Sequence, residues 1–206
     1  MIKEEDKYRI IPVFSSPLFK VKEKFNMTNN LKNHINNLPM SENDNNLISQ
    51  NKHLLTTDQN MIPLRDYIVN WLNYYTKTIL SIKNVEFYIT QSWLNITRQT
   101  ESHHPHEHPN SIISGVFHFE DKLSDIEFST DKPNFNLQFE FENYNLYNGT
   151  SWSFETEANT LILFPSKTRH KVKVNKENTN RTSLSFNTYV KGKLGSEEGA
   201  DLLYLT

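Results

Sequence analysis

The stretch from Ser102 to Ser111 holds the residue types best suited to chemistry. Four of the chain's eight histidines fall there: His103, His104, His106 and His108. The chain contains no cysteine, so a metal ion would have to be held by histidine, aspartate, glutamate or water. Side chains alternate between the two faces of an extended strand. Histidines two positions apart therefore point the same way, and the spacing predicts that two of them grip one ion.

Strand alternation leaves two choices for this pair. His104, His106 and His108 share one face. His103 and Glu107 are predicted to turn toward the opposite face. The pair is therefore either His106 with His108, which we prefer, or His104 with His106. Histidines that only line a polar surface turn are the non-functional alternative.

A third ligand has to come from elsewhere in the chain. Two histidines follow the cluster, at His118 and His170. His170 is favoured, because it follows a predicted strand and a Pro165-Ser166 turn and then opens another strand. Arg181 lies eleven residues further on, at the start of the apolar run LSFNTYV. That position favours a buried guanidinium with a fixed orientation over a guanidinium in a surface ion pair.

Length and composition indicate the size and the class of the protein. A chain of 206 residues suits one domain with a substantial core. We expect a single domain over 1–206, with an N-terminal arm and helices at 1–84, a β core at 85–191 and a tail at 192–206. The formal net charge of -2 gives no basic footprint for nucleic acid. No signal peptide or membrane span is visible, which predicts a cytoplasmic protein.

The first 84 residues predict helices and an extended arm. Pro12 and Pro17 exclude the arm at 8–20 from a central strand. Thr28 can cap a short helix that ends at Pro39. Residues 40–60 are polar and predict a loop. Apolar residues at helical spacing predict a long helix from Pro63 to Ile82, lying against a sheet.

The pattern then changes to short strands separated by turns. They are predicted at Glu86–Thr97, Ile112–Glu120, Asp125–Ser129, Phe135–Phe141, Thr160–Phe164, Thr168–Val174 and Ser183–Val190. Short antiparallel strands at this spacing favour a sandwich or barrel over a parallel sheet. The predicted fold class is mainly β with N-terminal helices: a double-stranded β-helix, or jelly roll, with the helices packed on its outer face.

The order of these motifs resembles a known superfamily. The motifs are His-x-His-Pro-Asn at 106–110, the run Gly115-Val116-Phe117, Phe-Pro-Ser-x-x-x-His at 164–170, and Arg-x-Ser-x-Ser-Phe-Asn at 181–187. As an ordered set they resemble the 2-oxoglutarate/Fe(II)-dependent oxygenases. In particular, the chain is similar to small oxygenases of phages and marine bacteria that are related to the prolyl hydroxylases.

The resemblance implies roles for single residues. His106 matches the first iron ligand and His170 the distal ligand, and His108 stands where the superfamily at large has aspartate. Arg181 matches the arginine that holds the far carboxylate of 2-oxoglutarate. Residues implied to assist in cosubstrate binding are Ser183, Asn95 and His118. The alternative for His118 is a core histidine with satisfied hydrogen bonds, which we prefer, and the alternative for Asn95 is a polar strand residue that faces solvent. Arg98 is a weaker candidate for reaching substrate.

The function implied is that of an Fe(II)- and 2-oxoglutarate-dependent dioxygenase, a hydroxylase that releases succinate and CO2. Ascorbate is a further candidate as reductant. If the gene belongs to a phage, the protein would act in the cytoplasm of the host cell. The rivals are a three-histidine, cupin-like dioxygenase or metal hydrolase without 2-oxoglutarate, and a non-catalytic jelly-roll binding module.

The sequence does not determine the substrate of the iron centre. A protein side chain, a free amino acid, a nucleobase and a small metabolite would all suit the same metal. A homodimer is also left open. Specificity is expected to rest on the loops at 40–60, 98–103 and 142–152.

Overall fold

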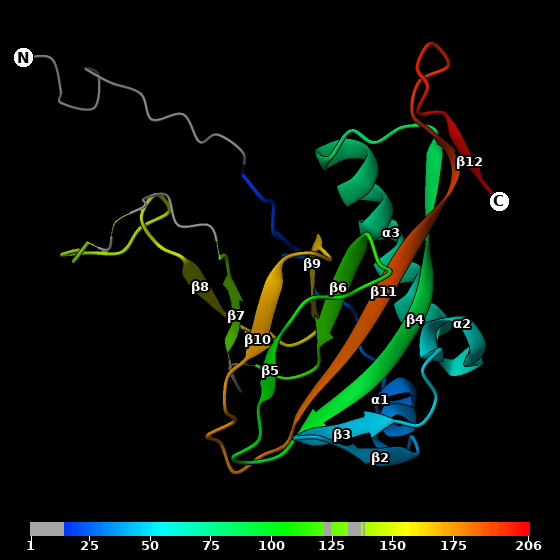
Figure 1. Ribbon diagram of the computed structural model, residues 1–206. Helices are drawn as coiled ribbons and strands as arrows, with labels where there is room; N and C mark the ends of the chain where they lie inside the picture. The colour runs from blue at the N-terminus through cyan, green and yellow to red at the C-terminus, as the bar shows by residue number, and fades with distance from the viewer. Residues whose placement is uncertain (1–14, 122–124, 132–136, 138) are drawn as a thin grey trace, which may run out of the picture.

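The computed structural model describes residues 15–121, 125–131, 137 and 139–206. They form two antiparallel β-sheets with helices against one of them (Figure 1). The larger sheet has the strand order β1-β9-β6-β11-β4-β3-β2, with β12 also paired to β11. The smaller sheet has the order β5-β10-β7-β8. This is the predicted jelly roll with helices.

The strands of the larger sheet come from the N-terminal, middle and C-terminal parts of the chain. They are β1 (Phe19–Lys20), β2 (Met40–Asn43), β3 (Asn46–Ser49), β4 (Val85–Thr97), β6 (Ile113–His118), β9 (Thr160–Pro165), β11 (Arg181–Leu194) and β12 (Leu203–Leu205). The strands of the smaller sheet are β5 (His103–His106), β7 (Asp125–Ser129), β8 (Ser151–Glu155) and β10 (Arg169–Val172). Strands β4 and β11 are the longest strands of the larger sheet, and they pair over almost their whole length.

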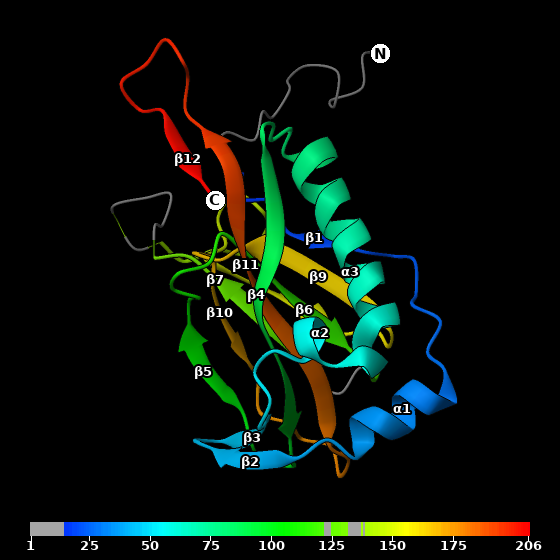
Figure 2. The same ribbon diagram turned by 90° about the vertical axis from the view of Figure 1, so that its right-hand side faces the viewer.

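Helices cover the outer face of the larger sheet (Figure 2). They are α1 (Asn29–Asn36), α2 (Leu54–Thr57) and α3 (Ile62–Tyr74), and α3 continues as a π-helical turn at Tyr75–Ile79. Thr28 caps α1 as predicted, because its Oγ1 accepts a hydrogen bond from the Leu31 amide. Pro63 lies in the first turn of α3, where a missing N–H costs nothing. None of the described helices has both the length and the apolar character that a membrane crossing requires.

Two apolar cores hold these layers together. The main core joins the buried face of α3, including Leu64, Ile68 and Leu72, to the outer face of the larger sheet. A smaller core lies between the two sheets and contains Phe128 and Phe164. The space between the sheets is therefore only partly filled by apolar side chains, and the remainder is polar.

Gly115 of the sequence motif has a packing role. A Cβ atom there would lie 2.3 Å from the ring of Phe186 and 2.8 Å from Leu163. The glycine lets the Phe186 ring of β11 cross β6 at close range. It belongs to the core on the helix side of the sheet.

Most predicted elements are present, with three differences. The segment 40–60, predicted as a loop, contains the β2–β3 hairpin and α2. Strand β8 was not predicted, and the predicted strand at 135–141 falls partly outside the described residues and has no strand at 139–141. The arm forms the short edge strand β1 at its end, paired with β9, while its first residues lie outside the described part.

Candidate active site

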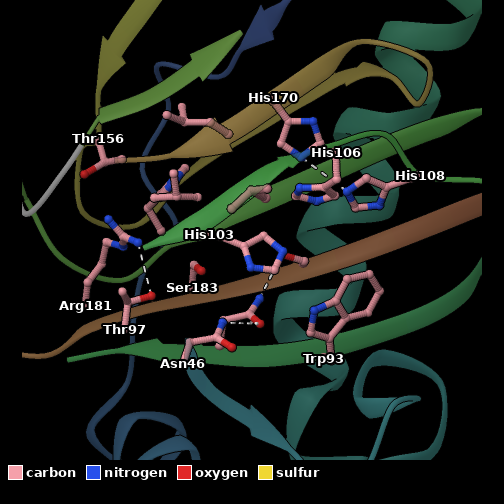
Figure 3. Close-up of a pocket in the computed structure, with 16 residues that line it drawn as sticks. Asn46, Trp93, Thr97, His103, His106, His108, Thr156, His170, Arg181 and Ser183 are labelled. Carbon is pink, nitrogen blue, oxygen red and sulfur yellow. Dashed lines mark hydrogen bonds between the residues drawn. The ribbon is translucent and has the colours of Figure 1, made fainter. Parts of the chain in front are cut away.

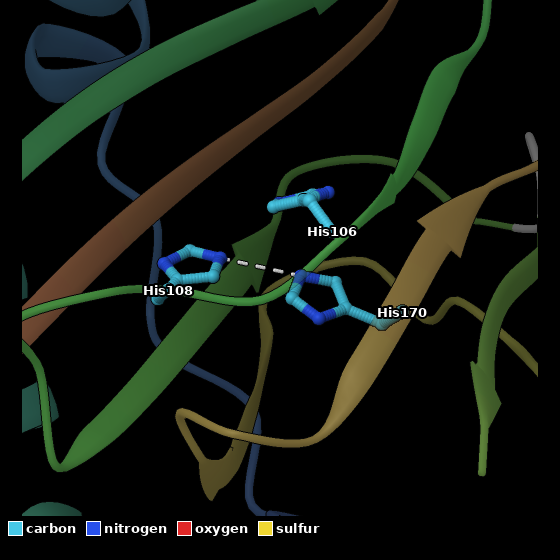
Figure 4. Close-up of side chains that lie close together, drawn as sticks. All are labelled: His106, His108 and His170. Carbon is cyan, nitrogen blue, oxygen red and sulfur yellow. Dashed lines mark hydrogen bonds between the residues drawn. The ribbon is translucent and has the colours of Figure 1, made fainter. Parts of the chain in front are cut away.

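Three histidines meet at one end of the space between the sheets. His106 is the last residue of β5 and lies directly opposite His170 of β10. His108 follows two residues later, where its amide donates to the carbonyl of Ser166 at 3.0 Å. One ring nitrogen from each of the three histidines lies within 4.8 Å of the others (Figure 4). Of the two predicted pairs, the structure brings His106 and His108 together with His170, whereas His104 is exposed on the strand.

The hydrogen bonds of the rings orient them for a metal. The Nδ1 atoms of His106 and His170 each lie 2.9 Å from a backbone carbonyl, that of His104 and that of Thr168. The Nδ1 of His108 lies 2.5 Å from Asn187 Oδ1. These oxygens can only accept, so each Nδ1 carries the proton and each Nε2 keeps a free lone pair.

The free lone pairs converge. The Nε2 atoms of His108 and His170 are 3.3 Å apart. Two lone pairs this close repel each other unless a cation lies between them. Nitrogen ligands about 2.1 Å from one metal ion, at roughly a right angle, are about 3 Å apart. The three donors therefore fit one transition-metal ion, which would be held from a single side.

Burial keeps these ligands in the neutral form that binds metal. It lowers the pKa of His170 to about 3, and it lowers the pKa of His106 and of His108 below the ordinary value. Among the described residues, no carboxylate belongs to this cluster. Three neutral imidazoles would thus leave the full charge of a divalent ion uncompensated by the protein.

Asn187 and a group of serines hold His108 from behind. The Asn187 Oδ1 that accepts from His108 also accepts from Ser114 Oγ at 3.0 Å. Ser166 Oγ lies 2.8 Å from both Ser114 Oγ and Ser111 Oγ. All of these residues except Ser111 are buried. Sequence reasoning gave Asn187 no role, although a lone carboxamide inside the apolar run LSFNTYV was a usable signal.

We expect Asn187→Ala to lower the affinity for Fe(II) by about 10- to 100-fold, because His108 would lose the acceptor that fixes its tautomer. Asn187→Asp should restore the affinity, since a carboxylate also accepts from Nδ1. Anaerobic calorimetric titration with Fe(II) measures both. Asn175→Ala is the control, because it removes a buried carboxamide bonded only to backbone groups. Unchanged affinity in Asn187→Ala would show that Asn187 only fills space.

A buried arginine lies in the same cavity as the histidines (Figure 3). Arg181 is only 5% exposed, and its Nη2 donates to Thr97 Oγ1 at 3.1 Å. Its Nη1 is buried and has no hydrogen-bond partner among the residues that the structure describes. Burial lowers the pKa of Arg181 to about 10, so the guanidinium stays charged at neutral pH. A buried cation with a free donor indicates a site for an anionic group.

Two further polar atoms in this cavity lack partners. They are His118 Nδ1 and Thr156 Oγ1, both buried. Ser183 of β11 pairs with His118 of β6, so it stands beside His118 on the cavity wall. Unpaired buried polar groups are costly, and a carboxylate oxygen could satisfy several of them at once. His118 is therefore no satisfied core histidine, and Thr156 is a lining residue that the sequence did not reveal.

Asn95 lines the cavity as well, between the histidines and the β2–β3 hairpin. Its Nδ2 donates to Ser185 Oγ at 3.1 Å, and its Oδ1 accepts from Asn46 Nδ2 at 3.3 Å. Its amide is thus fixed in place by two neighbours on the cavity wall.

One expectation about a neighbouring residue was wrong, and another gains no support from the cavity. His103 does not turn away, because the pairing of β5 with β10 shifts between His170 and Val172. His103 lines the cavity with its ring 4.5 Å from that of His106. Arg98 does not line this cavity, because Glu42 and Glu101 hold it in ion pairs.

Comparison with known proteins relates the central part of the chain to one family. Residues 91–187, which include the three clustered histidines and Arg181, match a family model described as "Putative 2OG-Fe(II) oxygenase". This part of the chain, just under half of its length, is similar to the 2OG-Fe(II) oxygenases. A comparison with curated proteins gives no match.

Solved structures of this kind share the fold. A 2OG-Fe(II) oxygenase family oxidoreductase from Burkholderia pseudomallei is 12% identical, with a TM-score of 0.59 and 83% of each chain covered. HygX from Streptomyces hygroscopicus, solved with nickel and 2-oxoglutarate bound, is 7% identical, with a TM-score of 0.57 and 84% and 82% covered. SnoN, a non-heme alpha ketoglutarate dependent epimerase from nogalamycin biosynthesis, is 10% identical, with a TM-score of 0.60 and 92% and 89% covered.

Proposed function

We propose that this oxygenase hydroxylates a C–H bond, with iron held by His106, His108 and His170 and 2-oxoglutarate held by Arg181. One observation carries the proposal: a neutral three-histidine cluster and a buried, half-paired guanidinium line one cavity. A dicarboxylate with one end on the metal and the other on Arg181 would satisfy both.

Each group in the cavity has a defined task in this reaction. His106, His108 and His170 would hold the iron, which when bound would supply the chemistry that couples oxidation of 2-oxoglutarate to succinate and CO2 with transfer of one oxygen atom from O2 to substrate. Because only three protein groups would hold the ion, cosubstrate and oxygen would have room to approach it. The fork of Arg181 suits a terminal carboxylate, and Thr97 holds that fork in place.

The groups beside Arg181 complete the carboxylate site. His118 and Thr156 have buried polar atoms without partners, and Ser183 lies next to His118. Hydrogen bonds from these groups would orient the cosubstrate, so that its keto-acid end faces the histidines. A metal enzyme without 2-oxoglutarate, or a silent binding module, would leave the buried Arg181 donor without a reason.

The test is turnover of 2-oxoglutarate without added substrate. Purified protein with Fe(II), ascorbate and 2-oxoglutarate labelled at C1 is expected to release labelled CO2 and to form an equal amount of succinate slowly. Samples without Fe(II), or with a chelator, should form none. If no succinate forms and metal-loaded protein does not bind 2-oxoglutarate, the proposal is wrong.

A further inference from the structure

An open groove adjoins the histidine cluster and is separate from the Arg181 end of the cavity. It has a volume of about 570 Å³ and is lined by residues of the β2–β3 hairpin, β4, β5, the segment 107–110 and β11. His106, His108 and Trp93 line both the groove and the cavity. A molecule in the groove would therefore reach the metal from the outside, while 2-oxoglutarate occupies the inner cavity. A volume of this size suits a small-molecule site.

The groove offers hydrogen-bonding groups without positive charge. Its lining contains the carboxamides of Asn43, Gln91, Asn95 and Asn110, and the carboxylate of Glu107. No lysine or arginine of the described part of the chain lines the groove. A phosphate or carboxylate group that moves from water into the groove loses its hydration, and cationic donors would have to compensate for that loss. The negative charge of Glu107 would also repel such a group.

The carboxamides on one wall are held in fixed orientations. Asn43 Nδ2 donates to Asn46 Oδ1 at 2.9 Å, and Asn46 in turn donates to Asn95. Asn95 ends the series at Ser185. This chain of amides links the hairpin to the metal end of the groove. Fixed amides present both donors and acceptors, which suits a partner with both kinds of group.

Trp93 adds a flat aromatic surface next to the metal. Its ring stacks on the ring of His108, with centroids 6.0 Å apart and planes 23° apart. The side chain is half-buried and lines the groove. An indole beside fixed amides provides both apolar contact and hydrogen bonds for a ligand whose own surface is mixed.

We propose that this groove binds the primary substrate, and that the substrate is an uncharged molecule rich in hydroxyl or amide groups. The inference rests on the proposed function, because the groove opens at the same metal. Two kinds of molecule have these uncharged hydroxyl or amide groups: a saccharide and a peptide with capped ends. In the reaction, a substrate C–H becomes C–OH with one atom of O2, and the other atom enters succinate as 2-oxoglutarate loses CO2.

Substrate-stimulated succinate formation tests the inference. The panel pairs neutral mono- and oligosaccharides with their 6-phosphates, and N-acetylated, C-amidated serine tripeptides with their phosphoserine forms. At least one neutral member is expected to raise the rate at least about 10-fold above the uncoupled rate, and its phosphorylated partner is not. Which source stimulates identifies the substrate type. The inference is overturned if the phosphorylated members stimulate succinate formation as strongly as the neutral members or more strongly. It is also overturned if no neutral member stimulates succinate formation.

A variant pair links the effect to the groove. Asn43→Ala removes the first carboxamide of the series, far from the metal ligands, and should lower the ratio of stimulated to uncoupled rate about 10-fold. Asn33→Ala, an exposed carboxamide on α1 outside the groove, is the matched control and should keep the ratio. An unchanged ratio in Asn43→Ala overturns the assignment of the groove. Uncoupled succinate formation in the unmodified protein keeps this outcome distinct from failure of the proposed function, in which no succinate forms at all.

Discussion

Replacing His170 by alanine is expected to abolish stoichiometric binding of Fe(II). His170 supplies one of three donors, and its Nε2 lies 3.3 Å from that of His108. Loss of an outer hydrogen-bond partner lowers metal affinity by about 10- to 100-fold, so loss of a ligand should exceed that range. Anaerobic titration calorimetry and metal analysis of the purified variant measure the effect. Succinate formation should disappear with the metal.

His104→Ala is the matched control for this prediction. His104 belongs to the same histidine-rich stretch but is exposed. Its backbone carbonyl accepts from His106, and its ring lies 5.5 Å from the His106 ring on the outside of the cluster of three histidines. The variant should bind Fe(II) like the unmodified protein. Loss of metal in His104→Ala together with its retention in His108→Ala would contradict the ligand assignment and favour the pair His104 and His106.

Replacing Arg181 by alanine is expected to remove most of the affinity for 2-oxoglutarate and to leave metal binding intact. Truncating one partner of a buried, hydrogen-bonded charge pair costs about 2–5 kcal/mol, a loss of roughly 30- to 5000-fold in affinity. The affinity of Arg181→Lys for 2-oxoglutarate should lie between those of the unmodified protein and Arg181→Ala, because an ammonium group cannot form a bidentate contact with a carboxylate. Calorimetric titration of the metal-loaded proteins with 2-oxoglutarate measures all three.

Arg98→Ala provides the control, since Arg98 is held by Glu42 and Glu101 and does not line the cavity. It should keep the cosubstrate affinity. Unchanged affinity and activity in Arg181→Ala would instead support a three-histidine enzyme that works without 2-oxoglutarate. Metal content reports whether each variant still forms the histidine cluster.

The sequence predicted the long elements because their signals are local. The cap at Thr28, the proline at the start of α3 and the apolar run of β11 each carry a pattern that tertiary contacts do not change. The β2–β3 hairpin was missed, because polar asparagines conceal a pairing that depends on the edge of β4. Such short edge strands form through their neighbour and have little signal of their own.

The candidate site was partly readable for the same reason. The spacing of His106 and His108, and the turn before His170, are local features. The inward position of His103 depends on a register shift between two strands, which alternation along one strand cannot reveal. The partnerless atoms of His118 and Thr156, and the bond from His108 to Asn187, depend on strands distant in sequence. They became visible only once those strands were placed side by side.

The most direct test of the metal and cosubstrate site is a crystal grown with Fe(II) and 2-oxoglutarate without oxygen, with anomalous diffraction recorded at the iron edge. We predict one anomalous peak at about 2.1 Å from the Nε2 atoms of His106, His108 and His170. The far carboxylate of 2-oxoglutarate should contact the free Nη1 of Arg181. An iron peak on His103 or His104, or 2-oxoglutarate bound away from Arg181, would contradict this assignment.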